Sequence, residues 1–197
     1  MMHALAGRMT DALFQHCRLD SRKRGVYQYG CELFLSTSFS ALFIVLVSCF
    51  AGFVLEPLVF LSVFISLRIF VGGFHASTYG RCFVLSSFVY WSVIIANLAI
   101  YKYLEYSIHT PLMLVFTVIS VCTVFVYAPV RNRNHPLSEK MYAQNKVRSR
   151  KMICFYGILA FLLFFIPYCR EIAMLISTTL LTVSIMMVIP LYSERRQ

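Results

Sequence analysis

Long apolar segments alternate with short polar segments along most of the chain. Six apolar segments, each with few or no charged residues, run over roughly 31–54, 57–71, 82–101, 111–129, 152–168 and 172–192. About 20 consecutive apolar residues in a helix cross the hydrocarbon core of a bilayer. The pattern therefore predicts an all-α integral membrane protein with six transmembrane helices. No polar stretch is long enough to fold separately, which favours one polytopic domain over residues 1–197.

The N-terminal segment is amphipathic rather than uniformly apolar. The apolar positions recur at helical spacing, at Met2, Leu5, Met9, Leu13 and Cys17. Charged residues fall between them. This spacing predicts that residues 1–24 hold a helix in the membrane interface, with Gly25 breaking the pattern. The first 30 residues lack a compact apolar core followed by a cleavage site, so we expect no signal peptide.

Proline and glycine mark the expected span boundaries. The Glu56-Pro57 step separates the first two segments, and Gly72-Gly73 ends the second. Residues 109–111 mark the turn into the fourth segment, and Pro129 ends it. A very short turn around Pro167 separates the last two.

Composition and charge support a membrane location. The chain is 59% hydrophobic and 13% charged, whereas a soluble domain carries about 25% charged residues. Its net charge of +10 comes from basic residues that cluster between the apolar segments. With a cytoplasmic N-terminus and six crossings, 16 of the 18 Lys and Arg residues lie on the cytoplasmic side. This distribution predicts two cytoplasmic termini and contacts with lipid headgroups rather than with nucleic acid.

The seven cysteines do not suggest a disulfide framework. Their number is odd, no CxxC occurs, and several lie within apolar segments. No HExxH or paired Cys/His spacing is present, so we expect no metal and no cofactor.

One polar stretch, residues 68–82, combines residues that carry chemistry. It holds Arg68, the Gly72-Gly73 pair, His75, Arg81 and Cys82. A thiolate nucleophile needs a base or a positive neighbour, and His75 and Arg81 offer both. On a continuous helix, positions seven apart lie about 10.5 Å apart, so a His–Cys pair requires the chain to fold back. The residues alone leave a structural role open, because a cysteine at the end of a span is usually a small apolar residue.

Three stretches resemble the motifs of one known family. The run R-x-x-x-G-G-x-H-A from Arg68, followed by Cys82, resembles the signature of the accessory gene regulator B (AgrB) family. These are membrane cysteine endopeptidases that process the precursor of a cyclic quorum-sensing peptide. The stretch 29–32 resembles the family's Y-G-x-E pattern, and 127–129 with the basic residues 131–151 resembles its A-P motif and basic loop. Order and spacing match over about residues 20–155.

The resemblance implies roles for these residues. His75 and Cys82 carry over as the catalytic dyad, with Arg68 and the two glycines as supporting motif residues. Glu32 is a candidate for orienting His75. The other interpretation of Glu32 is a helix-start charge favoured by the helix dipole.

The resemblance also implies a substrate and a location. The expected partner is an AgrD-like precursor with an amphipathic helix, a signal segment and an acidic tail. The enzyme would remove the tail through an acyl-enzyme thioester and promote cyclisation to a thiolactone or lactone. The family further suggests a homodimer in the bacterial cytoplasmic membrane. A cytoplasmic loop over 130–151 would attract the tail through its basic residues, among them Arg131, Arg133, Lys146, Arg148, Arg150 and Lys151.

The alternative is a small transporter or channel without catalysis. It would use Arg68, His75 and Arg81 as polar groups lining a path. A receptor or scaffold would likewise need no thiol. Either class would tolerate Cys82→Ser, whereas a cysteine peptidase would lose nearly all turnover.

Overall fold

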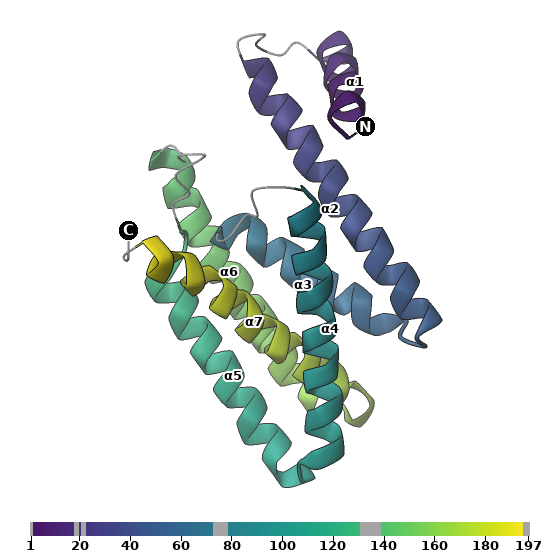
Figure 1. The fold of residues 1–197 in the computed structure, drawn as a ribbon. Coiled ribbons are helices and arrows are strands. Elements are labelled where there is room, and N and C mark those ends of the chain that lie inside the picture. Colours follow the sequence, from purple (N-terminus) through teal and green to yellow (C-terminus); the bar gives the residue numbers. More distant parts are fainter. Residues whose placement is uncertain (1, 18–19, 21–22, 73–78, 131–138, 195–197) are drawn as a thin grey trace.

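The computed structural model describes residues 2–17, 20, 23–72, 79–130 and 139–194 of the chain. All regular structure in these residues is helical (Figure 1), so the all-α prediction is confirmed. The elements are α1 (Met2–His16), α2 (Arg24–Phe50), α3 (Leu55–Val71), α4 (Tyr79–Tyr103), α5 (Tyr106–Tyr127), α6 (Glu139–Phe164), the 3₁₀ turn η2 (Pro167–Cys169) and α7 (Arg170–Glu194).

Four of the described helices are long and apolar enough to cross a membrane. They are α2, α4, α5 and α7, with mean hydropathies between 1.9 and 2.3 in their most apolar windows. Helix α3 has only 17 residues, and the first half of α6 carries several basic residues. The chain therefore has the helices of a multi-pass membrane protein, and a count of six crossings stays a prediction.

Two of the expected helix boundaries are wrong. Gly25 does not break the helix, because α2 begins at Arg24, seven residues before the expected start. A glycine is tolerated in the first turn, where few intrahelical bonds depend on it. The turn expected at 109–111 is also helical, because α5 begins at Tyr106 and contains Pro111. A proline near the start of an apolar helix removes only one backbone donor.

The expected basic loop is largely helical. Helix α6 begins at Glu139, so residues 139–151 form its first half rather than a loop. This segment is rich in Lys, Arg, Gln, Met and Ala, all strong helix formers, and its acidic first residue suits the positive end of the helix dipole. The basic residues therefore project from a rigid helix that continues into the apolar segment.

Helix α7 is the centre of the bundle. It packs against α3, α4, α5 and α6 (Figure 1), and every residue from Ala173 to Leu180 is buried. The largest core cluster joins Leu180 to Phe60 and Leu67 of α3, Tyr90 of α4 and other apolar residues of the bundle. A helix buried on all sides needs apolar or small residues all round, and the sequence of α7 supplies them.

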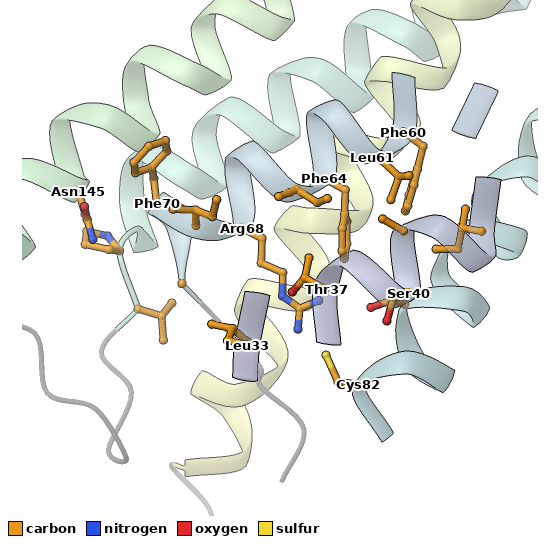
Figure 2. Close-up of a pocket in the computed structure, with 18 residues that line it drawn as sticks. Leu33, Thr37, Ser40, Phe60, Leu61, Phe64, Arg68, Phe70, Cys82 and Asn145 are labelled. Carbon is orange, nitrogen blue, oxygen red and sulfur yellow. The ribbon is translucent and has the colours of Figure 1, made fainter. Parts of the chain in front are cut away.

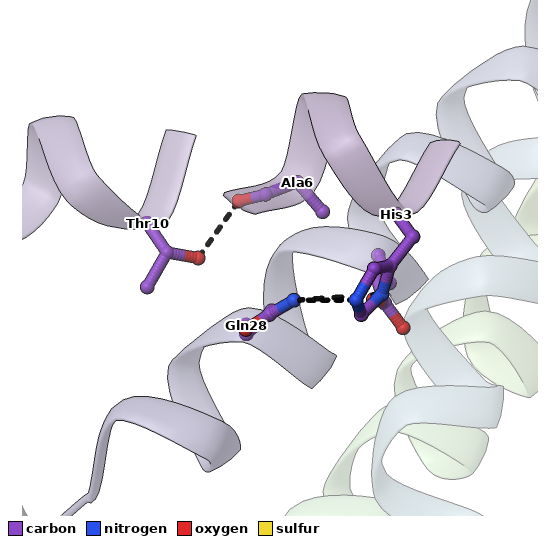
Figure 3. A network of polar contacts seen from close by, with 5 residues as sticks. His3, Ala6, Thr10 and Gln28 are labelled. Atoms are coloured by element: carbon purple, nitrogen blue, oxygen red, sulfur yellow. Dashed lines mark hydrogen bonds and ion pairs between the residues drawn. The ribbon is translucent and has the colours of Figure 1, made fainter. Parts of the chain in front are cut away.

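Helices α1 and α2 form an antiparallel hairpin at the edge of the bundle (Figure 1). Ala6 and Thr10 of α1 are fully buried, and the Thr10 hydroxyl donates to the Ala6 carbonyl (Figure 3). An ion pair between Asp11 and Arg24 also joins the two helices. The apolar residues Leu5 and Leu13 stay exposed, so α1 turns its small residues towards α2. Its location in the membrane interface stays a prediction.

Candidate functional site

A cavity of about 290 Å³ lies between α2, α3 and the start of α4 (Figure 2). Apolar residues, chiefly leucine, isoleucine and phenylalanine, form most of its wall. Six polar or charged residues interrupt this apolar lining, which are Thr37, Ser40, Arg68, Cys82, Ser86 and Asn145. An apolar pocket with a few convergent polar groups is the usual form of a ligand site.

Cys82 lies on the wall of this cavity, in the first turn of α4. Its thiol is free and half-buried, and Cys82 is the one cysteine of the seven that lines the cavity. The amino end of a helix carries a partial positive charge, which favours an anion at this position. Cys82 therefore combines partial exposure to the cavity with a position at the start of a helix.

Arg68 enters the cavity from the last turn of α3. Figure 2 shows its guanidinium and the Cys82 sulfur directed towards the same space. The Arg68 guanidinium also lies over the Phe64 ring, 5.3 Å from its centroid.

Gly72 joins two of the sequence motifs in space. It ends α3 with a φ of +74°, a conformation that residues with a side chain rarely adopt. A Cβ at this position would lie 2.8 Å from the Val130 carbonyl oxygen. The Val130 amide in turn donates to the Val71 carbonyl at 3.0 Å. The end of α3 and the segment after Pro129 are therefore packed backbone to backbone, and both border the cavity.

Gly73 and His75 lie outside the described residues, so the pairing of His75 with Cys82 stays a prediction. The neighbouring helices are described: α3 ends at Val71 and α4 begins at Tyr79. Cys82 thus belongs to a helix that starts after position 75.

Glu32 contacts the N-terminal helix. Its carboxylate is 2.5 Å from Nδ1 of His3, and the residue is buried in α2. Figure 3 shows His3 also turned towards Gln28 of α2. Glu32 is not part of the cavity wall, although its neighbour Leu33 is. The sequence pattern did not single out His3, because its partner lies 29 positions away.

The basic candidates divide into two groups. The Arg150 guanidinium donates to the Phe125 carbonyl at 2.9 Å, and that of Arg148 lies 5.7 Å from the Phe70 ring centroid. Lys146 and Lys151 are exposed on α6. Arg131 and Arg133 lie outside the described residues. The two lysines are thus the described candidates best placed to meet a soluble acidic segment.

Sequence reasoning missed the polar residues that α2, α4 and α6 bring to the cavity. Thr37, Ser40 and Ser86 lie within apolar helices, where a hydroxyl usually bonds its own helix, as Ser40 does with the Ser36 carbonyl at 2.9 Å. Asn145 lies one position before Lys146 and was hidden in the basic stretch. Only its place on α6 turns it towards the cavity. Among the described residues, no three His, Cys, Asp or Glu side chains gather as metal ligands would.

Comparison with known proteins identifies the family of the chain. The family described as "Accessory gene regulator B" matches residues 6–189. An AgrB-like protein of Clostridium perfringens (strain SM101 / Type A) is 24% identical over 160 residues, which cover 79% of this chain and 74% of the relative. AgrB-like protein 2 of C. perfringens (strain 13 / Type A) is 23% identical over the same shares. No solved structure matches the chain. Because the family match spans nearly the whole sequence, this chain belongs to the accessory gene regulator B (AgrB) family.

Proposed function

We propose that this protein is a membrane-embedded cysteine endopeptidase that cleaves the acidic tail from an AgrD-like peptide precursor. The observation that carries the proposal is Cys82, a free thiol on the wall of an apolar cavity that also contains Arg68. Both residues belong to the motif that resembles the family signature. Membership of the AgrB family supports the precursor as substrate.

The proposed reaction begins at the Cys82 sulfur. His75 takes the thiol proton, and the thiolate attacks the carbonyl at the end of the signal segment. His75 then protonates the leaving amine, the acidic tail departs, and the signal segment is held as a thioester on Cys82. A cysteine of the substrate displaces Cys82, so one thioester replaces another and the ring closes without ATP. A substrate serine would give a lactone in the same way.

The apolar lining of the cavity supports acyl transfer over hydrolysis. Water that reached the thioester would release a linear peptide instead of a ring. Side chains such as Phe60, Phe64 and Ile44 leave little polar surface to hold water beside Cys82.

The first half of α6 is the proposed docking surface for the acidic tail. Lys146 and Lys151 are exposed there, and Asn145 on the same helix reaches the cavity. A tail held on this helix would leave the scissile bond close to the cavity. The attraction is electrostatic, so binding should weaken as salt is raised.

The decisive experiment is mass spectrometry of the enzyme mixed with a precursor whose own Cys is replaced by Ala. Ring closure is then blocked, and the acyl group should accumulate on Cys82 or leave slowly as a linear peptide. An acyl group on another cysteine, or cleavage by Cys82→Ala protein, would contradict the mechanism. A transporter would tolerate Cys82→Ser, whereas a cysteine peptidase would not. Activity of the Cys82→Ser variant therefore distinguishes a transporter from a peptidase.

We further propose six crossings in the bacterial cytoplasmic membrane, with both termini cytoplasmic, and a homodimer. The family and the apolar helices support a bacterial membrane location. Reporter fusions after residue 105 should lie outside and fusions after residue 140 inside. A cytoplasmic reporter at 105 would exclude this topology. Cross-linking in native membranes tests the dimer, and only monomers would count against it.

A further inference from the structure

Cys82 and Ser86 line the cavity from the same face of α4. Side chains four positions apart in an α-helix are neighbours one turn apart, with their Cβ atoms about 5–6 Å from each other. This spacing is set by the helix itself and does not depend on how the helices of the bundle pack. The Cys82 thiol therefore has a hydroxyl at a fixed position beside it on the cavity wall.

The Ser86 hydroxyl is not used by its own helix. A serine in an apolar helix usually donates to the carbonyl four positions before it. Ser92 of α4 does so, because its hydroxyl donates to the Phe88 carbonyl at 2.8 Å. Ser86 makes no such bond, and its hydroxyl has no hydrogen-bond partner among the residues that the structure describes, although the residue is only 9% exposed. A buried donor of this kind is expected to be satisfied by a group that enters the cavity.

The attack of Cys82 on a peptide carbonyl creates an acceptor at the right distance from Ser86. The carbonyl oxygen becomes an oxyanion that lies two covalent bonds from the Cys82 sulfur. A hydrogen bond from a hydroxyl to such an oxygen adds about 2.5–2.7 Å. Together these lengths match the spacing of one helical turn, which separates the two side chains. The apolar wall around them strengthens a hydrogen bond to a developing charge.

We propose that Ser86 donates the hydrogen bond that stabilises the oxyanion formed when Cys82 attacks the precursor. This role rests on the proposed function, in which Cys82 is the nucleophile. As the C–S bond forms, the carbonyl electron pair moves to the oxygen, and Ser86 shares its proton with that oxygen without losing it. When the C–N bond to the tail breaks, the carbonyl reforms and the leaving amine takes the proton held by His75. Ser86 is thus a catalytic residue that touches the reacting carbonyl.

The first test is the steady-state cleavage of an AgrD-like precursor by the full-length protein in proteoliposomes. Ser86→Ala should lower kcat by about 10²–10³-fold, the usual loss when one oxyanion donor is removed, and should leave KM close to the wild-type value. Ser86→Thr keeps a hydroxyl and should retain most of the activity. Ser92→Ala is the matched control, because Ser92 lies on the same helix, outside the cavity lining, and its hydroxyl is bound by its own backbone. Its kcat should equal that of the wild type.

The second test separates stabilisation of the oxyanion from an effect on the thiol itself. Iodoacetamide alkylates a cysteine by forming an S–C bond with loss of iodide, and this reaction passes through no oxyanion. Peptide mass spectrometry of the protein without precursor measures the alkylation rate at Cys82. Ser86→Ala should be alkylated there at the wild-type rate although its kcat has fallen. A purely structural role of Ser86 would instead change both rates together.

Three results would overturn the role of Ser86. They are a kcat of Ser86→Ala within a few-fold of the wild type, a parallel fall in its Cys82 alkylation, and a Ser86→Thr protein that is alkylated normally but cleaves no better than Ser86→Ala. If Ser86→Ala does not fold, Ser86→Cys decides, because a thiol of similar size is only a weak donor. A large loss of kcat in Ser86→Cys supports the role, and normal turnover refutes it. Cleavage by Cys82→Ala would instead refute the proposed function, whereas an inactive Cys82→Ala beside a fully active Ser86→Ala would refute the role of Ser86 alone.

Discussion

Helices α7 and α2 are almost equally hydrophobic but occupy different environments. The most apolar window of α7 has a mean hydropathy of 2.3 and is 61% buried inside the protein. The corresponding window of α2 has a hydropathy of 2.2 and is only 22% buried. Hydropathy reports that a helix is stable in lipid, and it does not report which helix packs at the centre. In this protein the central helix builds the core, whereas the peripheral helix α2 borders the cavity.

The side chains explain the difference between the two helices. Small hydroxyl residues of α7 are buried against its neighbours; the Thr178 hydroxyl, for example, donates to its own helix at Met174 and to Asn97 of α4. Small residues allow helices to approach closely in a membrane. Helix α2 instead carries exposed aromatic residues, among them Phe34 and Phe50, which suit contact with lipid. A polar contact from the Ser48 hydroxyl to the Tyr90 hydroxyl, at 2.8 Å, joins α2 to α4.

The largest effect is expected at the cavity. Cys82→Ala should abolish precursor cleavage while leaving thermal stability close to that of the wild type, because the residue lies on a cavity wall. Cys82→Ser should also lose nearly all turnover. The matched control is Cys154→Ala, which should cleave normally. Precursor cleavage measures the activity, and melting curves in detergent measure the stability. Normal cleavage by Cys82→Ala would show that the cavity is not the catalytic site.

The next effect is expected in α7. Leu180→Ala should destabilise the protein by about 2–4 kcal/mol, because Leu180 is fully buried and its removal leaves a cavity. Leu46→Ala in α2 is the matched control, since that leucine is half exposed and lipid can fill the space it leaves. Reversible unfolding in mixed micelles measures both changes. Equal losses at the two positions would show that α2 is packed as tightly as α7.

A smaller effect is expected where α3 ends. Gly72→Ala should cost about 1–3 kcal/mol, because the new Cβ would lie 2.8 Å from the Val130 oxygen and the φ of +74° is strained for alanine. Gly52→Ala is the control, since Gly52 has a φ of +88° but open space around it. The difference in melting temperature between the two variants isolates the contact with Val130. If both variants melt together, backbone conformation alone accounts for the loss.

The smallest effect is expected on the exposed face of α6. Replacing Lys146 and Lys151 by Gln should raise KM by a few-fold and leave kcat and stability unchanged, because exposed charge pairs contribute about 0.2–1 kcal/mol each. The neutralisation of Arg148 and Arg150 should also lower stability, since both guanidinium groups contact the fold. Cleavage kinetics at low and high salt, measured for the lysine variant and for the arginine variant, distinguish the roles of the two pairs of residues. A fall in kcat for the lysine variant would assign α6 a role in the chemistry.

The sequence by itself determined the helical class and the apolar runs of a membrane protein, and it indicated Cys82 as the candidate nucleophile. These properties depend on local information: helices close their own backbone bonds, and apolar runs of sufficient length favour lipid. The motif that placed Cys82 after Arg68 and Gly72 is likewise a matter of spacing. Helix ends were less predictable, as Gly25 and Pro111 show, because a single breaker near a helix start costs little.

The tertiary structure alone decided which helix is central and which residues share the cavity. Helix α7, which holds the buried Leu180, packs against four other helices, and no feature of its own sequence identifies them. Asn145 reaches the cavity because α6 extends beyond its apolar half. A glycine is needed at position 72 because the Val130 backbone, 58 positions away in the sequence, leaves no space for a side chain there. Contacts of this kind join residues that are distant in the chain, so their geometry is set by packing of the whole bundle rather than by local preference.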